Sequence, residues 1–290
     1  MRLALIGTGL IGASAAWAMK QKGVVDTVAA FDLSPESTRK SLQMGIADEA
    51  CATLEACVQG ADCVMVAVPV LAIEKVMAQC EPFLGEETLV TDVGSVRGAV
   101  IEGARRALKG KFANYAPVHP IAGGEMPGVD YARSDLFAGA KAISTPAEGM
   151  HEHAVQFWEQ AWKAIGCELL RMTPAEHDAV FASVSHLPHL LSYAMVDSIL
   201  NTGSAERKLS LAGAGFRDFT RIAASSPEMW VDIFRANKEA VLEALDYFEQ
   251  NLKLLRTAIE NDEQDVVRSL FARAAQARRR IAPNLPKKRS

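Results

Sequence analysis

The stretch "RLALIGTGLIG", residues 2–12, runs from a short apolar segment into a turn with three glycines. The apolar part has the length of a buried β-strand, and the amphipathic pattern of residues 10–22 predicts a helix directly after the turn. Gly7 permits the tight turn, Gly9 leaves room for a phosphate beside the backbone, and Gly12 lets the helix pack closely on the strand. The free amides at the start of that helix favour an anionic group, so the stretch predicts a dinucleotide site.

The context of this motif matters, because glycine turns between a strand and a helix also occur without ligands. The strand predicted at residues 27–32 ends on Asp32, twenty residues after Gly12. A carboxylate there accepts hydrogen bonds from ribose hydroxyls and repels a 2′-phosphate, so we predict NAD rather than NADP, a preference that Arg39 could soften. Pro69 fits the nicotinamide side of the site and equally well a simple strand stop. The predicted cofactor-binding residues are Gly7, Thr8, Gly9, Leu10, Ile11, Gly12, Asp32, Val68 and Pro69.

The first 172 residues alternate apolar runs with amphipathic segments, which predicts a mostly parallel sheet covered by helices on both faces. From Thr173 on, apolar residues recur at helical spacing, and Thr173, Pro174 and Glu176 form a capping-box pattern. We predict a Rossmann-type α/β dinucleotide-binding domain over residues 1–172 and an all-α domain over residues 173–290. The predicted strands are residues 2–7, 27–32, 62–69, 88–94, 114–120, 141–146 and 167–172, and the helices of the first domain include residues 10–22, 72–80, 96–108 and 151–165.

Composition narrows the class of protein. A formal net charge of -4 argues against a nucleic-acid partner, and the basic residues near the end of the chain read as a solvated tail. Five cysteines without a pairing pattern, and no signal peptide, fit reduced thiols in a cytoplasm. We find no apolar run of the roughly 18–20 residues that a membrane span needs, so we expect a cytoplasmic protein without membrane contact.

Two predicted strands are followed by residues suited to chemistry. Ser95 follows one strand, where its hydroxyl could serve the site, cap the next helix, or both. In "HPIAGG" Pro120 keeps His119 out of a helix, so we expect the imidazole at the end of its strand, with two glycines after it that let the chain bend beside a ligand. Ligands of open α/β sheets bind at this edge, which makes His119 a candidate acid–base residue.

The helical half carries a second group of candidates. In "SHLPHLL" His186 and His189 lie one helical turn apart, and Pro188 between them should kink the helix and free a carbonyl near both rings. Two histidines at this spacing can share zinc, but no further ligand cluster is near, and two core histidines are the stronger alternative. We therefore predict no metal site.

The segment "GFRDFTRIAASSPEMW", residues 215–230, adds basic residues after a glycine-rich turn. Arg217 and Arg221 are four apart, so we expect them on one helix face. Paired guanidinium groups suit the recognition of a carboxylate, with a surface salt-bridge network as the alternative.

The motifs "GTGLIG", "DVGSV", "HPIAGGE", "SHLPH" and "GFRDFTRIA" occur here in the order in which prephenate and arogenate dehydrogenases of tyrosine biosynthesis carry them. The resemblance extends over residues 1 to about 275, and "HPIAG" with "SHLPH" is far more specific than the glycine motif. It implies oxidation of the ring alcohol of a cyclohexadiene by NAD, with loss of the ring carboxylate as carbon dioxide. The product is 4-hydroxyphenylpyruvate from prephenate or tyrosine from arogenate; the sequence does not separate the two.

The resemblance also implies roles for the site residues. His119 takes the proton of the ring hydroxyl, Ser95 orients His119 and the substrate, and Arg221 holds the ring carboxylate, for which Arg217 is the alternative. The other substrate-binding residues that it implies are His189 at the substrate side chain, His186 as its support, Glu125 and Asp218 in an ion network with Arg221 at the entrance, and Trp230 reaching the site of a neighbouring subunit.

Further expectations come from the same resemblance. The helical domain should pair two copies into a homodimer. In contrast to longer relatives, we expect no fused mutase segment and no appended regulatory domain. The nearest rival is another two-domain NAD(P)-dependent β-hydroxyacid or imine oxidoreductase. A protein that senses NAD without turnover is a further alternative, but it gives no reason for His119, Ser95 and Arg221 to occur together.

Overall fold

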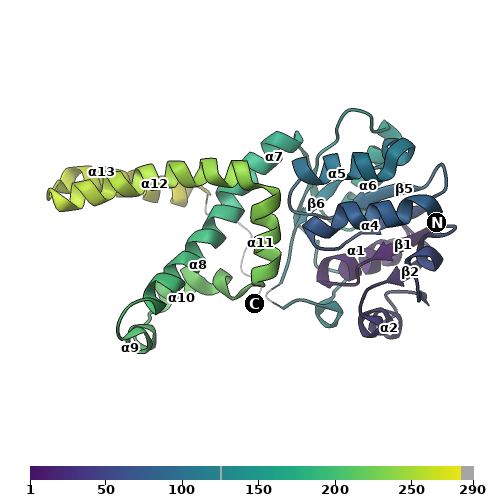
Figure 1. Ribbon diagram of the computed structural model, residues 1–290, viewed down its shortest axis with the longest axis horizontal. Helices are drawn as coiled ribbons and strands as arrows, with labels where there is room; N and C mark the ends of the chain where they lie inside the picture. Colours follow the sequence, from purple (N-terminus) through teal and green to yellow (C-terminus); the bar gives the residue numbers. More distant parts are fainter. Residues whose placement is uncertain (125, 282–290) are drawn as a thin grey trace. The chain divides into compact units, whose positions relative to one another are not determined.

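The computed structural model describes residues 1–124 and 126–281. Its first part is a five-stranded parallel sheet with the strand order β3-β2-β1-β4-β5, which lies between helices (Figure 1). The strands are β1 Arg2–Ile6, β2 Thr27–Phe31, β3 Glu49–Ala50, β4 Cys63–Val66 and β5 Leu89–Asp92. The helices are α1 Leu10–Gln21, α2 Pro35–Gln43, α3 Leu54–Val58, α4 Ile73–Cys80, α5 Gly98–Leu108 and α6 Glu152–Ala164.

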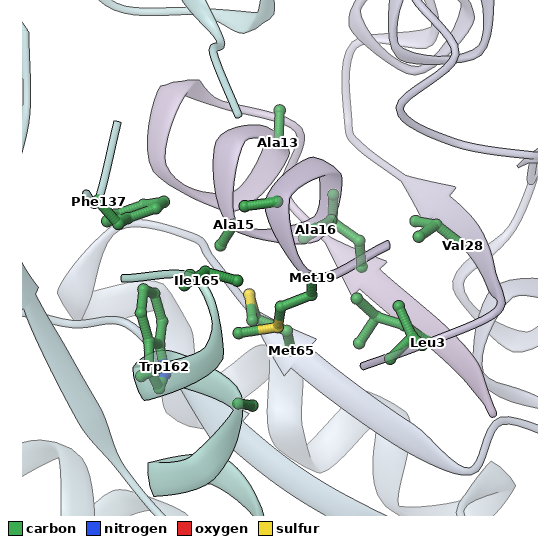
Figure 2. Packing of buried hydrophobic residues seen from close by; sticks show 14 of the residues in the cluster. Leu3, Ala13, Ala15, Ala16, Met19, Val28, Met65, Phe137, Trp162 and Ile165 are labelled. Carbon is green, nitrogen blue, oxygen red and sulfur yellow. The ribbon is translucent and has the colours of Figure 1, made fainter. Parts of the chain in front are cut away.

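Both faces of this sheet are buried, as continuous apolar strands predict. Side chains alternate along β1, so that Leu3 and Leu5 pack in one core with α1 and α6, while Ala4 and Ile6 pack in a second core with α3, α4 and α5. Figure 2 shows the first core, where Met19 of α1 and Met65 of β4 lie close to Trp162 of α6. The predicted Rossmann-type domain is confirmed.

The glycine turn after β1 is packed as its sequence requires. Gly7 has φ +96°, and a Cβ there would lie 2.3 Å from the carbonyl oxygen of Ala67. A Cβ on Gly12 would lie 2.4 Å from the carbonyl oxygen of Gly7. Both contacts are too short for any side chain, so these glycines let β1, α1 and the end of β4 pack against one another.

A second sheet corrects the prediction of one mostly parallel sheet. It has three strands in the order β6-β7-β8: β6 Val118–Ile121, β7 Lys141–Ser144 and β8 Glu168–Arg171. β6 runs antiparallel to β7, and Pro120 is tolerated because β6 is an edge strand. Residues 114–117 are not part of this strand: Asn114 ends a 3₁₀ helix, Lys109–Asn114, and Tyr115 forms only an isolated bridge.

His119 is therefore the second residue of β6 rather than the end of its strand. Val118 and Pro120 are buried and His119 and Ile121 are half-buried, so the imidazole lies on the more open face. Before β6, Tyr115 pairs with Val90 of β5 in parallel, and this register carries His119 past the carboxyl end of β5.

The helices after Thr173 begin as the capping pattern predicts. The hydroxyl of Thr173 accepts a hydrogen bond from the amide of Glu176 at 3.2 Å, and Pro174 opens α7. A π-helical turn, Ala182–His186, lies directly before Pro188, which removes a backbone donor and disturbs the ladder. The helices of this part are α7 Pro174–Phe181, α8 Leu187–Leu200, α9 Ala205–Ser210, α10 Ala214–Thr220 and α11 Pro227–Ala236.

The contacts divide the chain into two compact units, residues 1–238 and 239–290. The described residues of the second unit belong to two long helices, α12 Lys238–Glu260 and α13 Gln264–Ile281, joined by a turn in which Asp262 has φ +56°. The predicted boundary between residues 172 and 173 is a different division, at the point where strands give way to helices, and it stays a prediction.

The run Pro174–Leu200 corrects one expectation about membranes. These 27 residues have a window of mean hydropathy 1.2, which by length and composition alone suffices to cross a membrane. Near the start of this run, His177 and Asp178 hydrogen-bond to the first domain, as described below. Of this window, 28% is buried within the single chain.

Candidate active site

The cofactor-binding candidates come together at the carboxyl edge of the parallel sheet. The carboxylate of Asp32, at the end of β2, accepts hydrogen bonds from the amide of Thr8 at 2.7 Å and from its hydroxyl at 3.1 Å. The amide of Ser34 donates to its other oxygen at 2.9 Å. Asp32 therefore lies against the glycine turn, and the oxygen that accepts only from Ser34 keeps acceptor capacity for a ribose hydroxyl.

The turn also has room for a ligand on one side. A Cβ on Gly9 would meet no atom within 4 Å, in contrast to the crowded Gly7 and Gly12. Gly9 is the N-cap residue of α1, so the free amides of that helix start at this open position. Val68 and Pro69 follow β4 beside the turn, half-buried and exposed respectively. The arrangement fits a dinucleotide pyrophosphate.

Ser95 lies on a turn between β5 and α5 that is built on a buried ion pair. Asp92 and Arg97 are both fully buried, and the guanidinium donates to the two carboxylate oxygens at 2.7 and 3.2 Å. The amide of Gly94 at 2.7 Å and the hydroxyl of Tyr115 donate to the same carboxylate. Burial disfavours the charged form of Arg97, but Asp92 outweighs it and raises its pKa.

Ser95 does not cap α5, which corrects one of the two readings of this serine. The helix begins at Gly98 instead of Val96, because the carboxylate of Asp178 from α7 takes the place of a cap. Its two oxygens accept hydrogen bonds from the amides of Arg97 and Gly98, each at 2.8 Å. A carboxylate at the start of a helix is stabilised by the free amides and by the helix dipole.

His119 is the first of three side chains that are joined by hydrogen bonds. Its Nδ1 lies 2.9 Å from Nε2 of His177, and Nδ1 of His177 lies 2.9 Å from Oδ1 of Asp178. The ring of Phe181 stacks on His177 and meets His119 edge-on at 4.9 Å between centroids. The side chain of His177 is fully buried.

These contacts fix the tautomer of each imidazole. The ionised carboxylate of Asp178 only accepts, so Nδ1 of His177 carries the proton and Nε2 is an acceptor. Nδ1 of His119 must then be the donor toward His177, which leaves Nε2 of His119 unprotonated. A histidine in this state can act as a general base through Nε2.

The surroundings of His119 disfavour its cationic form. Burial lowers its pKa well below 6.5, and the charge of Arg97 and the neighbouring rings of His177 and His186 act in the same direction. Burial also lowers the pKa of His177, although Asp178 opposes this effect. Burial opposes ionisation of Asp178, but hydrogen bonds from His177 and from two amides outweigh it and lower its pKa.

The two histidines around Pro188 take different partners. His186 is buried, and its Nδ1 lies 3.1 Å from Nδ2 of Asn237, which also donates to the carbonyl of Asp178 at 2.9 Å. Burial lowers the pKa of His186 to about 4. Nδ1 of His189 donates to the carbonyl of Ser185, within the π-helical turn, at 2.9 Å.

Trp230 lies inside its own chain. Its ring stacks on His189 at 3.7 Å between centroids, and it packs with Ile233 against Val96 beside the site. Only 6% of the residue is exposed. This placement differs from the one that the resemblance implied, in which Trp230 reaches a neighbouring subunit.

The basic residues of "GFRDFTRIA" are only partly brought together. α10 ends at Thr220 and a 3₁₀ turn, Arg221–Ala224, follows, so the four-residue spacing does not put Arg217 and Arg221 on one continuous α-helical face as expected. Arg221 is close enough to His189 for its charge to lower the pKa of that ring, after burial as the larger cause. Arg217, Asp218 and Arg221 are all exposed, and Glu125 lies outside the described residues.

Sequence reasoning missed His177 and Asp178. They directly follow the capping pattern of Thr173, Pro174 and Glu176, and nothing in the sequence around them indicates their contacts with His119 and with the start of α5. It also missed Arg97, which pairs with Asp92 five residues before it, and Asn237, whose partners are more than fifty residues away. Within residues 1–124 and 126–281, no group of three or more His, Cys, Asp or Glu side chains is arranged to hold a metal ion.

A glycine turn with Asp32 at the sheet edge, together with a helix that holds His119 in the tautomer of a general base, is typical of the class of NAD-dependent dehydrogenases. Two family models cover most of the chain: the nucleotide-binding domain of prephenate dehydrogenase matches residues 15–171, and its dimerization domain matches residues 173–273. The chain belongs to the prephenate dehydrogenase family.

Individual relatives agree with this assignment. The cyclohexadienyl dehydrogenase of Zymomonas mobilis is 34% identical over 280 residues, which are 95% of this chain and 94% of the relative. The crystal structure of prephenate dehydrogenase from Aquifex aeolicus with hydroxyphenyl propionate and NAD+ has a TM-score of 0.91 at 32% identity, covering 97% of this chain and 98% of that one. Arogenate dehydrogenase of Synechocystis has a TM-score of 0.82 at 27% identity, covering 97% and 99%.

Proposed function

We propose that this protein is an NAD-dependent dehydrogenase of tyrosine biosynthesis that oxidises and decarboxylates prephenate, arogenate or both. The observation that carries the proposal is the hydrogen-bonded series from His119 through His177 to Asp178, which leaves Nε2 of His119 unprotonated and able to act as a base. Membership of the prephenate dehydrogenase family supports the reaction class, because the relatives are named as prephenate, cyclohexadienyl and arogenate dehydrogenases.

Each site residue has a separate role in the proposed reaction. Gly9 and the amides of α1 hold the pyrophosphate, and Asp32 holds a ribose; the bound NAD supplies the hydride acceptor. Nε2 of His119 accepts a hydrogen bond from the ring hydroxyl and takes its proton as hydride leaves the ring carbon, while Ser95 orients this hydroxyl. Such a base contributes about 10²–10⁴-fold to the rate.

Charge complementarity supports the substrate assignment. Arg221 binds the ring carboxylate until that group leaves as carbon dioxide, and its planar guanidinium fixes the direction of the carboxylate. His189 faces the substrate side chain with Nε2 as an acceptor, because its Nδ1 donates to Ser185. Release of carbon dioxide yields an aromatic ring, which supplies the driving force.

We also propose that the helical residues after Thr173 pair two copies of the chain. The match to a dimerization domain supports this. Large apolar side chains are exposed on these helices in the single chain, among them Met195, Leu200, Leu211, Phe219, Leu252, Ile259 and Phe271. A homodimer would cover apolar surface of this kind.

The test is NADH formation with prephenate and with arogenate as separate substrates, repeated with NADP and with added tyrosine. We expect turnover with at least one substrate and preference for NAD. Turnover of a simple β-hydroxyacid, without turnover of either cyclohexadiene, would contradict the proposal. Binding of NAD without any turnover would point instead to a sensing protein.

A further inference from the structure

The side chain of His177 has no place in the reaction described so far, yet it is fully buried and joins His119 to Asp178. At the end of this series of side chains, the carboxylate of Asp178 accepts hydrogen bonds from the amides of Arg97 and Gly98 at the start of α5. This series of hydrogen bonds therefore runs from the substrate side of His119 into the protein and ends on backbone amides.

The proton balance of the proposed reaction makes this arrangement meaningful. Hydride leaves the ring carbon, the bond to the ring carboxylate breaks, and its electron pair enters the ring as carbon dioxide departs. The ring oxygen carries a proton in the alcohol and again in the phenol. The proton that His119 takes from the ring oxygen is therefore returned to the same oxygen, and the reaction releases no net proton.

A buried imidazolium at His119 alone would be costly. The guanidinium of Arg97 and the rings of His177 and His186 already disfavour its positive charge. His177 is better placed to carry the charge, because it adjoins the carboxylate of Asp178 and lies in the field of Asp92, with Arg97 as the opposing charge. Transfer of a proton from His119 to His177, across one hydrogen bond, places the positive charge beside the carboxylate of Asp178.

We propose that His177 is a positioning residue that sets the tautomer of His119 and holds the substrate's hydroxyl proton, paired with Asp178, until the ring becomes aromatic. As Nε2 of His119 gains the substrate proton, its Nδ1 proton passes to Nε2 of His177. On aromatisation both protons return along the same path. This inference rests on the proposed function, since it assigns His177 a role in that reaction.

The decisive variants are His177→Gln and His177→Leu. Glutamine offers an oxygen to Nδ1 of His119 and an N–H to Asp178, but it cannot take up a proton, whereas leucine removes both contacts. His153→Gln is the matched control, because His153 is exposed on the surface of α6. Asp178 is left unchanged, because its loss would also uncap α5.

The kinetic measurement is the single-turnover rate of NADH formation in mixtures of H₂O and D₂O. We expect His177→Gln to lower this rate at least ~10-fold, with KM within about threefold of the parent, and His153→Gln to have no effect. The parent should show a curved dependence on the D₂O fraction, from more than one moving proton, and His177→Gln a straight one. An unchanged rate, or a curve that persists in His177→Gln, would overturn the storage of a proton on His177.

A second measurement needs no substrate. The six histidines can be followed by their ¹⁵N resonances, and in the parent His119 should carry its proton on Nδ1 and lose this preference in His177→Leu. A proton on Nε2 of His119 in the parent would refute the positioning role. If the parent turns over neither cyclohexadiene, the proposed function fails while the tautomer result still stands, so the two failures are distinguishable.

Discussion

The buried ion pair of Asp92 and Arg97 supports the turn that carries Ser95, and we expect Asp92→Asn to destabilise the protein strongly. Both side chains are fully buried, and Asp92 also accepts from Gly94 and Tyr115. The amide keeps one acceptor oxygen but removes the charge that neutralises the guanidinium. Leaving a buried charge unpaired costs about 3–5 kcal/mol, whereas the pair itself adds little beyond an apolar substitute.

The assay is urea unfolding followed by circular dichroism. With a urea dependence of about 2 kcal/mol per molar, this loss lowers the midpoint by roughly 1.5–2.5 M. Glu74→Gln is the matched control, because Glu74 and Arg106 form an equally short two-pronged pair, 2.9 and 2.7 Å, on the surface. We expect that exposed pair to matter far less. Equal midpoints for Asp92→Asn and Glu74→Gln would refute the reasoning.

Three further predictions concern binding and pH. Arg221→Lys should raise KM for the cyclohexadiene several-fold, because an ammonium cannot make the two-pronged carboxylate contact; an unchanged KM would move that role to Arg217. Asp32→Ser should raise kcat/KM with NADP relative to NAD, and an unaltered ratio would contradict the role of Asp32. The pKa of His186 is about 4 when folded and near 6.5 when unfolded, so the unfolded chain binds the extra proton. Because His186 is buried in its neutral form, the free energy of unfolding should decrease as the pH falls from 6.5 toward 4. Urea midpoints that increase as the pH is lowered over this range would exclude the effect.

Local sequence patterns sufficed for the glycine turn and the elements around it. The glycine turn, its flanking strand and helix, and Asp32 are encoded within about thirty residues, so their packing follows from spacing. The same holds for the cap at Thr173 and the disturbed helix before Pro188. Each of these features depends on residues that are neighbours in the chain.

Features that depend on contacts between distant segments could not be predicted from local sequence patterns. The start of α5 was predicted two residues early, because its cap is Asp178, which is eighty residues away. The direction of β6 depends on its pairing with β7, and the proline in it gave no sign of which partner it would take. His177 was missed for the same reason, since its importance appears only once His119 lies beside it.

The central claim is that His119 is the base, and one measurement tests it most directly. His119→Asn should keep the parent's affinity for NAD, because the cofactor turn is built from other residues. Its rate of NADH formation with the preferred cyclohexadiene should fall by about 10²–10⁴-fold at pH 7. An unchanged rate in this variant, with NAD still bound, would contradict the account.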